Sequence, residues 1–291
     1  MAAVFAKSEW KDFFDNIAAI FLMKKRSATL SLLLPNHRHT PSSKCIIFRL
    51  DDVTDYCYSV AQIAVMDLFF ANDQKISLGL EMNRIGEDKP LMEKILQGNN
   101  KGLLELCLHG WAHEDYSKLN KVEQEDLLRM CNSEMQSLFQ SVSNVFIPPY
   151  NRFNNHTLAV MTQLGISIIS AATYTDNQFF TVSGRGHDTF NFIVHIPETT
   201  TFEVFRSNKV YRVPVKRILQ DIDKSLRKYG YAVVTLHPLS FMKLERGKYA
   251  QSIDERQLHN LSLVIESLIS KNISITTFSE IGDRICNNTK P

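Results

Sequence analysis

The sequence predicts an α/β fold, specifically a distorted (β/α)7-8 barrel with parallel strands. Short apolar runs alternate with segments of helical periodicity along most of the chain, and this alternation is typical of a parallel sheet covered by helices. About seven such strand–helix units favour closure into a barrel. No glycine-rich loop follows the first strand, which disfavours an open dinucleotide-binding sheet.

Each predicted strand is a short apolar run that ends at polar or turn-forming residues, as expected for strands buried on both faces. In chain order these strands cover residues 45–50, 75–80, 103–108, 145–147, 166–169, 232–236 and 273–276. The predicted helices are segments in which apolar residues recur every three or four positions. They cover residues 58–70, 90–96, 158–164, 215–229 and 254–270, together with a helix after Asn120 and a short helix at the end of the chain.

The helix after Asn120 has the clearest boundary signal. Asn120 can accept a hydrogen bond from the first turn, and Glu123 stands three residues later, as a capping box requires. The predicted buried stripe of this helix consists of Leu127, Cys131, Met135 and Leu138.

Two regions depart from the strand–helix alternation. Residues 1–40 are predicted to be a leading helix and a linker, so we expect one barrel domain over residues 41–291. Residues 173–214 are predicted to be irregular apart from a strand at 192–196, and to form an excursion over the barrel mouth.

The composition excludes several classes of partner. The 33 Lys and Arg residues against 31 Asp and Glu residues leave a net charge of only +2, so we expect no nucleic-acid partner and no membrane association. The sequence does not predict an oligomeric state.

The expected compartment is cytoplasmic. The apolar segment 17–23 follows acidic residues and precedes basic ones, which is the reverse of a secretory signal; secretion stays open if the chain is a processed fragment. The five cysteines contain no CxxC pair, which favours buried reduced thiols over a disulfide framework or a zinc cluster.

Chemically reactive side chains follow the predicted strands, at the end where a parallel barrel carries its functional groups. The first strand ends in Asp51 and Asp52. Two adjacent carboxylates leaving a strand point to opposite sides, so one can bind a metal while the other acts as a base. The alternative is that one of them caps the following helix.

The third strand leads into His109 and His113. Histidines four residues apart on one helical turn face the same way and can share a metal ion, although core or surface histidines are the simpler explanation of such a pair. Trp111, between them, either stacks on a sugar ring or packs against the barrel rim.

Two further strands end in residues that suit acyl chemistry. The fourth strand is followed by Pro148, Pro149 and Tyr150, and the backbone N–H of Tyr150 could stabilise an oxyanion if this segment is more than a rigid turn. The strand at 232–236 is followed by His237, which could protonate a leaving group at neutral pH. One aspartate and two histidines would leave a coordination position open for water, as in catalytic zinc sites.

In this order, the motifs resemble those of polysaccharide deacetylases of the NodB-homology type, carbohydrate esterase family 4. The matching segments are Leu50-Asp51-Asp52-Val53, His109 with His113, Pro148-Pro149-Tyr150 and Leu236-His237. The resemblance implies a distorted barrel that hydrolyses N-acetyl amides or O-acetyl esters of a carbohydrate or small acetylated substrate with a divalent metal.

The resemblance also implies a role for each residue. Asp51 would be the general base, His237 the general acid, and Tyr150 the donor of a backbone N–H to the oxyanion. The implied metal ligands are Asp52, His109 and His113. This ligand set suits Zn²⁺ best, and Co²⁺, Ni²⁺, Mn²⁺ and Fe²⁺ also fit.

The sequence departs from the family in several of these motifs, which indicates a divergent branch. Around the two aspartates, Arg49-Leu50 and Val53 stand where the family usually has Thr-Phe and Gly. An arginine that orients the base in the family is replaced by Ile147, and Arg49 or Arg152 could substitute for it. The acidic fourth motif has only Asp176 as a candidate. Two alternatives therefore accompany the deacetylase hypothesis: a carbohydrate-binding pseudoenzyme on the same barrel, and a metal-dependent amidohydrolase that acts on a non-sugar amide.

Overall fold

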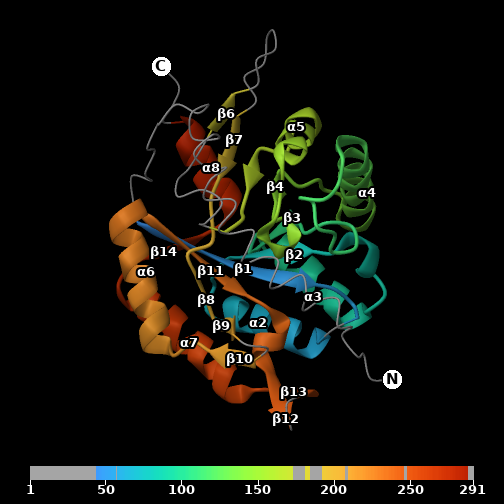
Figure 1. Ribbon diagram of the computed structural model, residues 1–291. Coiled ribbons are helices and arrows are strands. Elements are labelled where there is room, and N and C mark those ends of the chain that lie inside the picture. The colour runs from blue at the N-terminus through green and yellow to red at the C-terminus, as the bar shows by residue number, and fades with distance from the viewer. Residues whose placement is uncertain are drawn as a thin grey trace.

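The computed structural model describes residues 44–56, 58–172, 181–183, 192–206, 209–245 and 248–287. Within them, mostly parallel strands form a curled sheet with helices on its outer side (Figure 1), so the predicted α/β barrel class is confirmed. The sheet has ten strands in the order β6-β7-β5-β4-β3-β2-β1-β11-β8, with β14 also paired to β1. The predicted leading helix at 1–40 lies outside the described residues.

The strands of this sheet lie where the apolar runs predicted them, with short additions. They are β1 (Cys45–Val53), β2 (Ile76–Leu80), β3 (Leu104–Leu108), β4 (Val145–Phe146), β5 (Ile168–Ile169), β6 (Thr181–Ser183), β7 (Phe192–His195), β8 (Thr200–Thr201), β11 (Tyr231–Leu236) and β14 (Ser274–Thr276). Nearly every residue of β1, β2 and β11 is buried, because helices cover the outer face and barrel residues fill the inner face.

The helices also follow the predicted segments. They are α2 (Ser59–Ala71), α3 (Lys89–Asn100), α4 (Lys121–Phe139), α5 (Asn155–Leu164), α6 (Val215–Tyr229), α7 (Glu255–Ser270) and α8 (Phe278–Asn287). The predicted capping box of α4 is confirmed: Asn120 Oδ1 accepts from the Glu123 N–H at 3.1 Å, and Glu123 Oε2 accepts from the Asn120 N–H at 2.8 Å. The helix α6 ends at Gly230, whose φ of 78° is the left-handed conformation typical of a helix C-terminus.

The buried face of α4 differs slightly from the predicted stripe. Cys131 and Met135 are buried as expected, but Leu128 and Phe139 are buried in place of Leu127 and Leu138, which are partly buried and pack against the core. Gln124 also lies on this buried face, and its side-chain amide donates to the Tyr116 and Leu119 carbonyls of the preceding loop.

A single extended segment joins the two edges of the sheet. β7 pairs in parallel with β5, and β8, five residues further along the chain, pairs in parallel with β11. Between them, Ala172 forms a parallel bridge to Glu198. This segment therefore brings the sheet round on itself, as a barrel requires.

The predicted strand at 192–196 is confirmed as β7, but the prediction that the rest of residues 173–214 is irregular is wrong for the part that the structure describes. Besides β7 and β8, this region contains an antiparallel hairpin of β9 (Glu203–Arg206) and β10 (Lys209–Arg212). Its strands escaped the sequence analysis because the buried residue Glu203 is charged and pairs with Arg212 of the partner strand, so the expected apolar alternation is absent. Asp176 lies outside the described residues.

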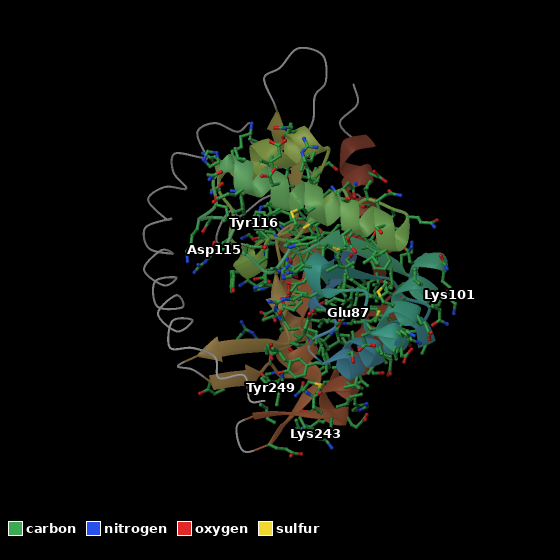
Figure 2. The ribbon with its side chains drawn as sticks, turned by 90° about the vertical axis from the view of Figure 1, so that its right-hand side faces the viewer. Glu87, Lys101, Asp115, Tyr116, Lys243 and Tyr249 are labelled. Carbon is green, nitrogen blue, oxygen red and sulfur yellow. The ribbon has the colours of Figure 1, made fainter. Side chains whose placement is uncertain are left out.

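A second hairpin, β12 (Met242–Glu245) with β13 (Lys248–Ile253), carries Lys243 and Tyr249 (Figure 2). The Tyr249 ring packs edge-on against Tyr58, with ring centroids 5.9 Å apart. Cys45, Cys107 and Cys131 are buried and form no disulfide, as predicted for them. Among the described helices, none combines the length and the apolar character needed to span a bilayer.

The core has two layers, and their arrangement decides where a site can form. One layer lies between the sheet and the helices. The other fills the barrel, where Phe278 and Ile281 of α8 pack with Ile47 and Val233. Because these residues fill the end of the barrel at which the strands begin, a cavity within the barrel can form at the opposite end, where the strands finish.

Candidate active site

All six predicted site residues line one cavity of about 220 Å³ at the carboxyl ends of the strands. They are Asp51, Asp52, His109, His113, Tyr150 and His237. Asp51 and Asp52 come from the end of β1, His109 follows β3, and His237 follows β11. Four other residues complete the lining: Pro148, Asn151, Glu203 and Leu239.

Asp52, His109 and His113 form a group that could hold a metal ion. Asp52 Oδ1 lies 3.0 Å from His109 Nε2 and 3.2 Å from His113 Nε2, and the three ligand atoms all lie within 4.8 Å of one another. His109 Nδ1 lies 2.7 Å from the carbonyl oxygen of Ile147. A donor at Nδ1 fixes the tautomer that leaves Nε2 unprotonated, which is the usual outer-shell arrangement of a metal-binding histidine. The residues present therefore fit a divalent cation such as Zn²⁺.

The electrostatics of this group reflect its close packing. Burial alone would raise the pKa of Asp52, but hydrogen bonds with His109 and His113 outweigh it and hold that pKa well below its usual value. Burial alone would lower the pKa of His109, yet the hydrogen bond with Asp52 and the charge of Asp51 raise it. Each shift shows that negative and positive charge stabilise each other here, as they would between carboxylate ligands and a cation.

The two histidines converge through a loop, and the prediction that they lie on one helical turn is wrong. Residues 109–115 form a bend in which Gly110 has φ 83° and His113 has φ 62°. The Glu114 carboxylate stabilises this bend by accepting from the N–H of Trp111 at 3.1 Å and of Ala112 at 2.8 Å. A side chain at Gly110 would bring its Cβ within 3.0 Å of that carboxylate, so the loop needs glycine there.

The two aspartates enter the same cavity, and the prediction that they point to opposite sides is wrong. Asp52 has φ 57°, and the pairing of β1 with β2 changes register between Leu50 and Val53. A bulge of this kind turns a strand and re-aims its side chains. The alternation of side chains between the two faces of β1 therefore fails at Asp51 and Asp52, and both carboxylates line the cavity.

Left-handed backbone is concentrated around this cavity. Asp52, His113, Tyr150 and Asn151 all have φ between 56° and 62°, a conformation that costs a non-glycine residue roughly 1–3 kcal/mol. Packing in the rest of the barrel must offset this conformational cost. Such a concentration of strained backbone is typical of a functional site rather than of a packing surface.

Arg49 is the arginine that accompanies Asp51. Its buried guanidinium places Nη2 3.0 Å from Asp51 Oδ2, while Nη1 donates to the backbone and side-chain oxygens of Ser170. Nη2 also donates to Asn151 Oδ1 and to Glu198 Oε2. Arg152, the other candidate, instead pairs with Asp115 at 2.6 Å.

Glu203 is a site residue that the sequence analysis missed. It is 3% exposed, and its Oε1 lies 3.9 Å from His237 Nδ1 while Oε2 accepts from Arg212 at 2.8 Å. Burial raises the pKa of Glu203, although His237 and Arg212 offset part of that effect. The only sequence signal was a lone acidic residue at the start of an unrecognised strand.

The side chains flanking the cavity have different exposures. Tyr150 is 54% exposed, and its ring stands edge-on to His113 with centroids 4.5 Å apart. Trp111 is partly buried and packs against the core, which supports the packing interpretation of this residue over sugar stacking.

Comparisons with known proteins agree with this architecture. A sequence model described as polysaccharide deacetylase matches residues 39–169. No curated protein sequence matches the chain.

Solved structures with the same fold share little sequence with the chain. A polysaccharide deacetylase homologue from Mycobacterium smegmatis has a TM-score of 0.64 at 11% identity, covering 89% of this chain and 95% of that one. A carbohydrate esterase family 4 pseudoenzyme from Bacillus anthracis has a TM-score of 0.52 at 13% identity. The match covers 82% of this chain and 66% of the pseudoenzyme, so the chain spans just under two thirds of that protein.

A family 4 acetyl xylan esterase from Clostridium thermocellum, solved with a cobalt ion, has a TM-score of 0.55 at 13% identity and covers 81% and 89% of the two chains. At such identities the structures establish the fold. The predicted resemblance to polysaccharide deacetylases is therefore confirmed: residues 39–169 match that family in sequence, and the described chain has the fold of solved carbohydrate esterase family 4 members.

Proposed function

We propose that the protein is a metal-dependent hydrolase that removes acetyl groups from a carbohydrate, as an N-acetyl amide or an O-acetyl ester. The observation that carries this proposal is the convergence of a three-ligand group, a second carboxylate and a further imidazole on one cavity of about 220 Å³. A catalytic metal site has three protein ligands and an open position, and acyl hydrolysis needs a base and an acid beside it.

Asp52, His109 and His113 are the residues that would hold the metal. A bound divalent cation would supply a Lewis acid that polarises an acetyl carbonyl and lowers the pKa of water toward neutrality. Asp51, anchored at Oδ2 by Arg49, keeps Oδ1 available to accept a proton from the attacking water. His237, which follows β11 and lines the same cavity, protonates the departing amine or alcohol.

The Tyr150 backbone completes this assignment. The left-handed conformation at Tyr150, with φ 58° and ψ 11°, turns the chain sharply after the two prolines and places the residue at the cavity wall. Its N–H would stabilise the oxyanion of the tetrahedral intermediate, a contribution worth about 3–4 kcal/mol of barrier for one such donor.

The alternative of an inactive carbohydrate-binding protein rests on Ile147, which stands where the family has an arginine. The Arg49–Asp51 pair at 3.0 Å favours the enzyme, because a guanidinium on β1 itself reaches the base in place of an arginine at position 147.

The test is metal content and acetate release measured on the same purified protein. Substrates should include N-acetylated chitooligosaccharides, acetylated xylan and simple non-sugar amides. We expect His109→Ala to lose both bound Zn²⁺ and activity, and Asp51→Asn to keep the metal but lose activity. His156→Ala is a matched control, since His156 lies on α5 outside the cavity. Full metal content in His109→Ala would overturn the ligand assignment, and release only from non-sugar amides would overturn the substrate class.

A further inference from the structure

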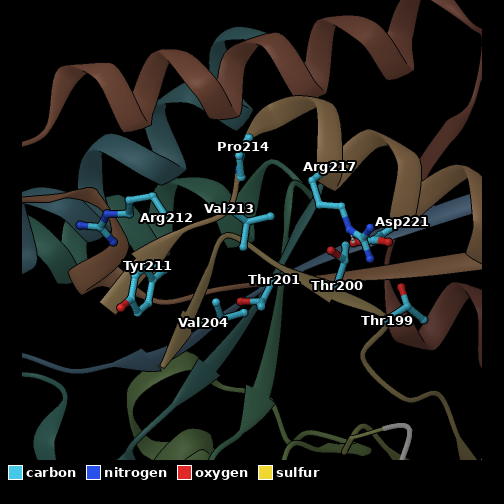
Figure 3. A pocket seen from close by; sticks show the side chains of 10 residues that line it. All are labelled: Thr199, Thr200, Thr201, Val204, Tyr211, Arg212, Val213, Pro214, Arg217 and Asp221. Carbon is cyan, nitrogen blue, oxygen red and sulfur yellow. Dashed lines mark hydrogen bonds and ion pairs between the residues drawn. The ribbon is translucent and has the colours of Figure 1, made fainter. Parts of the chain in front are cut away.

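The candidate active site has different surroundings on its two sides. In the sheet, β2 and β8 lie on opposite sides of β1. Toward β8, a cavity of about 710 Å³ (Figure 3) is separated from the site by the ion pair of Arg212 and Glu203, whose charged atoms lie 2.8 Å apart. Toward β2, the residue that follows the strand is Glu81, and its carboxylate is buried. This buried charge has no part in the chemistry proposed above.

Strand pairing places Glu81 between the strands that carry the proposed metal ligands. β2 pairs in parallel with β1 on one side and with β3 on the other. Asp52 stands at the end of β1, and His109 directly follows β3. Because the carboxyl ends of parallel strands meet at one edge of a barrel, Glu81 leaves the sheet between these two ligands. It is not among the residues that line the cavity of about 220 Å³, so it lies behind the ligands.

Main-chain hydrogen bonds fix the position of Glu81 relative to both ligand-bearing loops. The Glu81 N–H donates to the carbonyl of Val53 at 3.1 Å. The next two N–H groups, in the 3-10 turn η1 (Met82–Arg84), donate to the carbonyls of Gly110 at 3.2 Å and Trp111 at 3.0 Å. The end of β1 and the loop that joins the two histidines are therefore both bonded to the segment that begins at Glu81.

The carboxylate of Glu81 is buried with incomplete compensation of its charge. Its side chain is 7% exposed, and Oε2 accepts no hydrogen bond from the described residues. Arg84, its ion-pair partner, places Nη1 3.6 Å from Oε2, which is beyond hydrogen-bond length, and the arginine side chain is 47% exposed. Buried charges in proteins are normally paired closely or coordinate a metal. A cation held by the neighbouring ligands would supply the compensation that Arg84 supplies only weakly.

The electrostatic environment of Glu81 supports this connection. Burial raises the pKa of Glu81 above its usual value. The charge of His113 opposes that rise in pKa more strongly than the charge of Arg84 does, and the charge of Asp52 adds to it. Glu81 therefore interacts with the proposed ligands through space, and a cation beside them would favour its ionised form.

We propose that Glu81 is an outer carboxylate of the metal site, which strengthens the binding of a divalent cation to the three ligand residues without coordinating the ion itself. This inference rests on the metal dependence in the proposed function and deepens it, because it assigns a metal-affinity role to β2, a strand that supplies none of the three ligands. Glu81 is a positioning and charge-balancing residue, and it does not touch the substrate.

The experiment is titration of the metal-free, full-length protein with Co²⁺ and with Zn²⁺ against a competing chelator. The visible absorption of bound Co²⁺ reports the inner ligands. We expect Glu81→Gln, which removes the charge and keeps the shape, to bind both ions about tenfold more weakly, at the lower end of the range for outer-shell partners. The positions of its cobalt absorption bands should equal those of the wild type. Glu81→Asp, which keeps the charge on a shorter side chain, should recover part of the affinity.

Glu87→Gln is the matched control, because Glu87 is an exposed carboxylate that lines neither cavity. Equal dissociation constants for Glu81→Gln and Glu87→Gln would overturn the inference. Shifted cobalt bands in Glu81→Gln would overturn it too, because the inner ligands would then have changed.

Stability of the metal-free protein distinguishes a charge effect from a merely structural role. We expect metal-free Glu81→Gln to be at least as stable as the metal-free wild type in urea denaturation, because a neutral amide is easier to bury than an incompletely compensated carboxylate. A metal-free variant that is clearly less stable would show that Glu81 supports the fold instead, and would overturn its assignment to the metal site.

Acetate release on the same samples separates this inference from the proposed function. Metal binding that depends on Glu81, in a protein that releases no acetate, would support the outer carboxylate while the hydrolase proposal fails. Acetate release by a wild type whose metal affinity is the same as that of Glu81→Gln would overturn the role of Glu81 alone. A wild type that binds neither ion would overturn both.

Discussion

The guanidinium of Arg49 lies 3.0 Å from the carboxylate of Asp51, two residues further along the same strand. In an ordinary strand, residues i and i+2 share a face, so one strand supplies both the candidate base and its cationic partner. Arg49 is 1% exposed and also donates to Ser170, Asn151 and Glu198. It thereby ties β1 to the segments that follow β4, β5 and β7.

We predict that Arg49→Met lowers both stability and activity. Removing one partner of a buried ion pair leaves the other charge unpaired, which typically costs about 3–5 kcal/mol. Chemical denaturation should show this loss in the free energy of unfolding, and kcat for acetate release should fall with it.

The double variant Arg49→Met with Ile147→Arg separates the effect on stability from the effect on activity. Ile147 directly follows β4 and packs among buried residues, and it stands where the family has the arginine that orients the base, so we expect an arginine there to serve Asp51. We expect kcat to recover at least partly. An Arg49→Met single variant with unchanged kcat would show that Asp51 works without a cationic partner.

Metal binding should stabilise the fold. A cation that binds only the folded protein adds about 2.7 kcal/mol of stability at a concentration one hundred times its dissociation constant. We therefore expect Zn²⁺ to raise the Tm of the wild type and to leave the Tm of Asp52→Asn unchanged. Asparagine tolerates the left-handed φ of 57° at this position, so the variant tests the ligand rather than the backbone.

Glu114→Gln should weaken metal binding about tenfold, the lower end of the range for outer-shell partners. The Glu114 carboxylate accepts from two N–H groups of the loop that carries His113. Glu125→Gln is the matched control, because Glu125 pairs with Arg129 on the surface of α4. Equal dissociation constants for the two variants would mean that the loop keeps its shape without Glu114.

Glu203→Gln should impair the positioning of His237 and thus proton delivery to the leaving group. General acid catalysis contributes about 10²–10⁴-fold, and we expect a loss of about 10–100-fold in kcat on acetamido sugars. An aryl acetate, whose phenolate departs without a proton, should be hydrolysed at nearly the wild-type rate. Equal losses on both substrates would indicate a general structural defect instead, and Glu203→Asp should restore part of the amide activity.

His195 should make the protein sensitive to acid. Burial lowers the pKa of His195 to about 3, whereas an unfolded histidine titrates near 6.5. Between these values the unfolded chain binds the extra proton, so stability rises with pH across that window and is lost as pH falls from 6.5 toward 3. At pH 5 the loss is about 2 kcal/mol.

The measurement is urea denaturation of the metal-free protein at pH 7 and pH 5. His195→Leu should show a pH-dependent loss smaller by about 2 kcal/mol than that of the wild type, because an apolar side chain takes up no proton. Parallel losses in the two proteins would show that His195 is not the titrating group.

Much of the fold could be predicted because its signals are local. Buried parallel strands are apolar runs, and their ends are marked by the first polar residues, as at Asp51 and His109. The capping box at Asn120 specifies the start of α4 within one turn. The hairpin of β9 and β10 gave no such signal, since Glu203 and Arg212 stabilise it as an ion pair between strands rather than by apolar alternation.

The candidate site was predictable as a set of residues but not as a geometry. By itself the sequence determined that Asp52, His109 and His113 follow parallel strands, because the order of apolar runs fixes which residues reach the carboxyl edge of a barrel. Only the tertiary structure decided that Arg49 partners Asp51, that Glu203 faces His237, and that left-handed backbone turns Asp52 and His113 inward. Such contacts join residues distant in sequence or depend on single backbone dihedrals, and neither leaves a periodic trace in the chain.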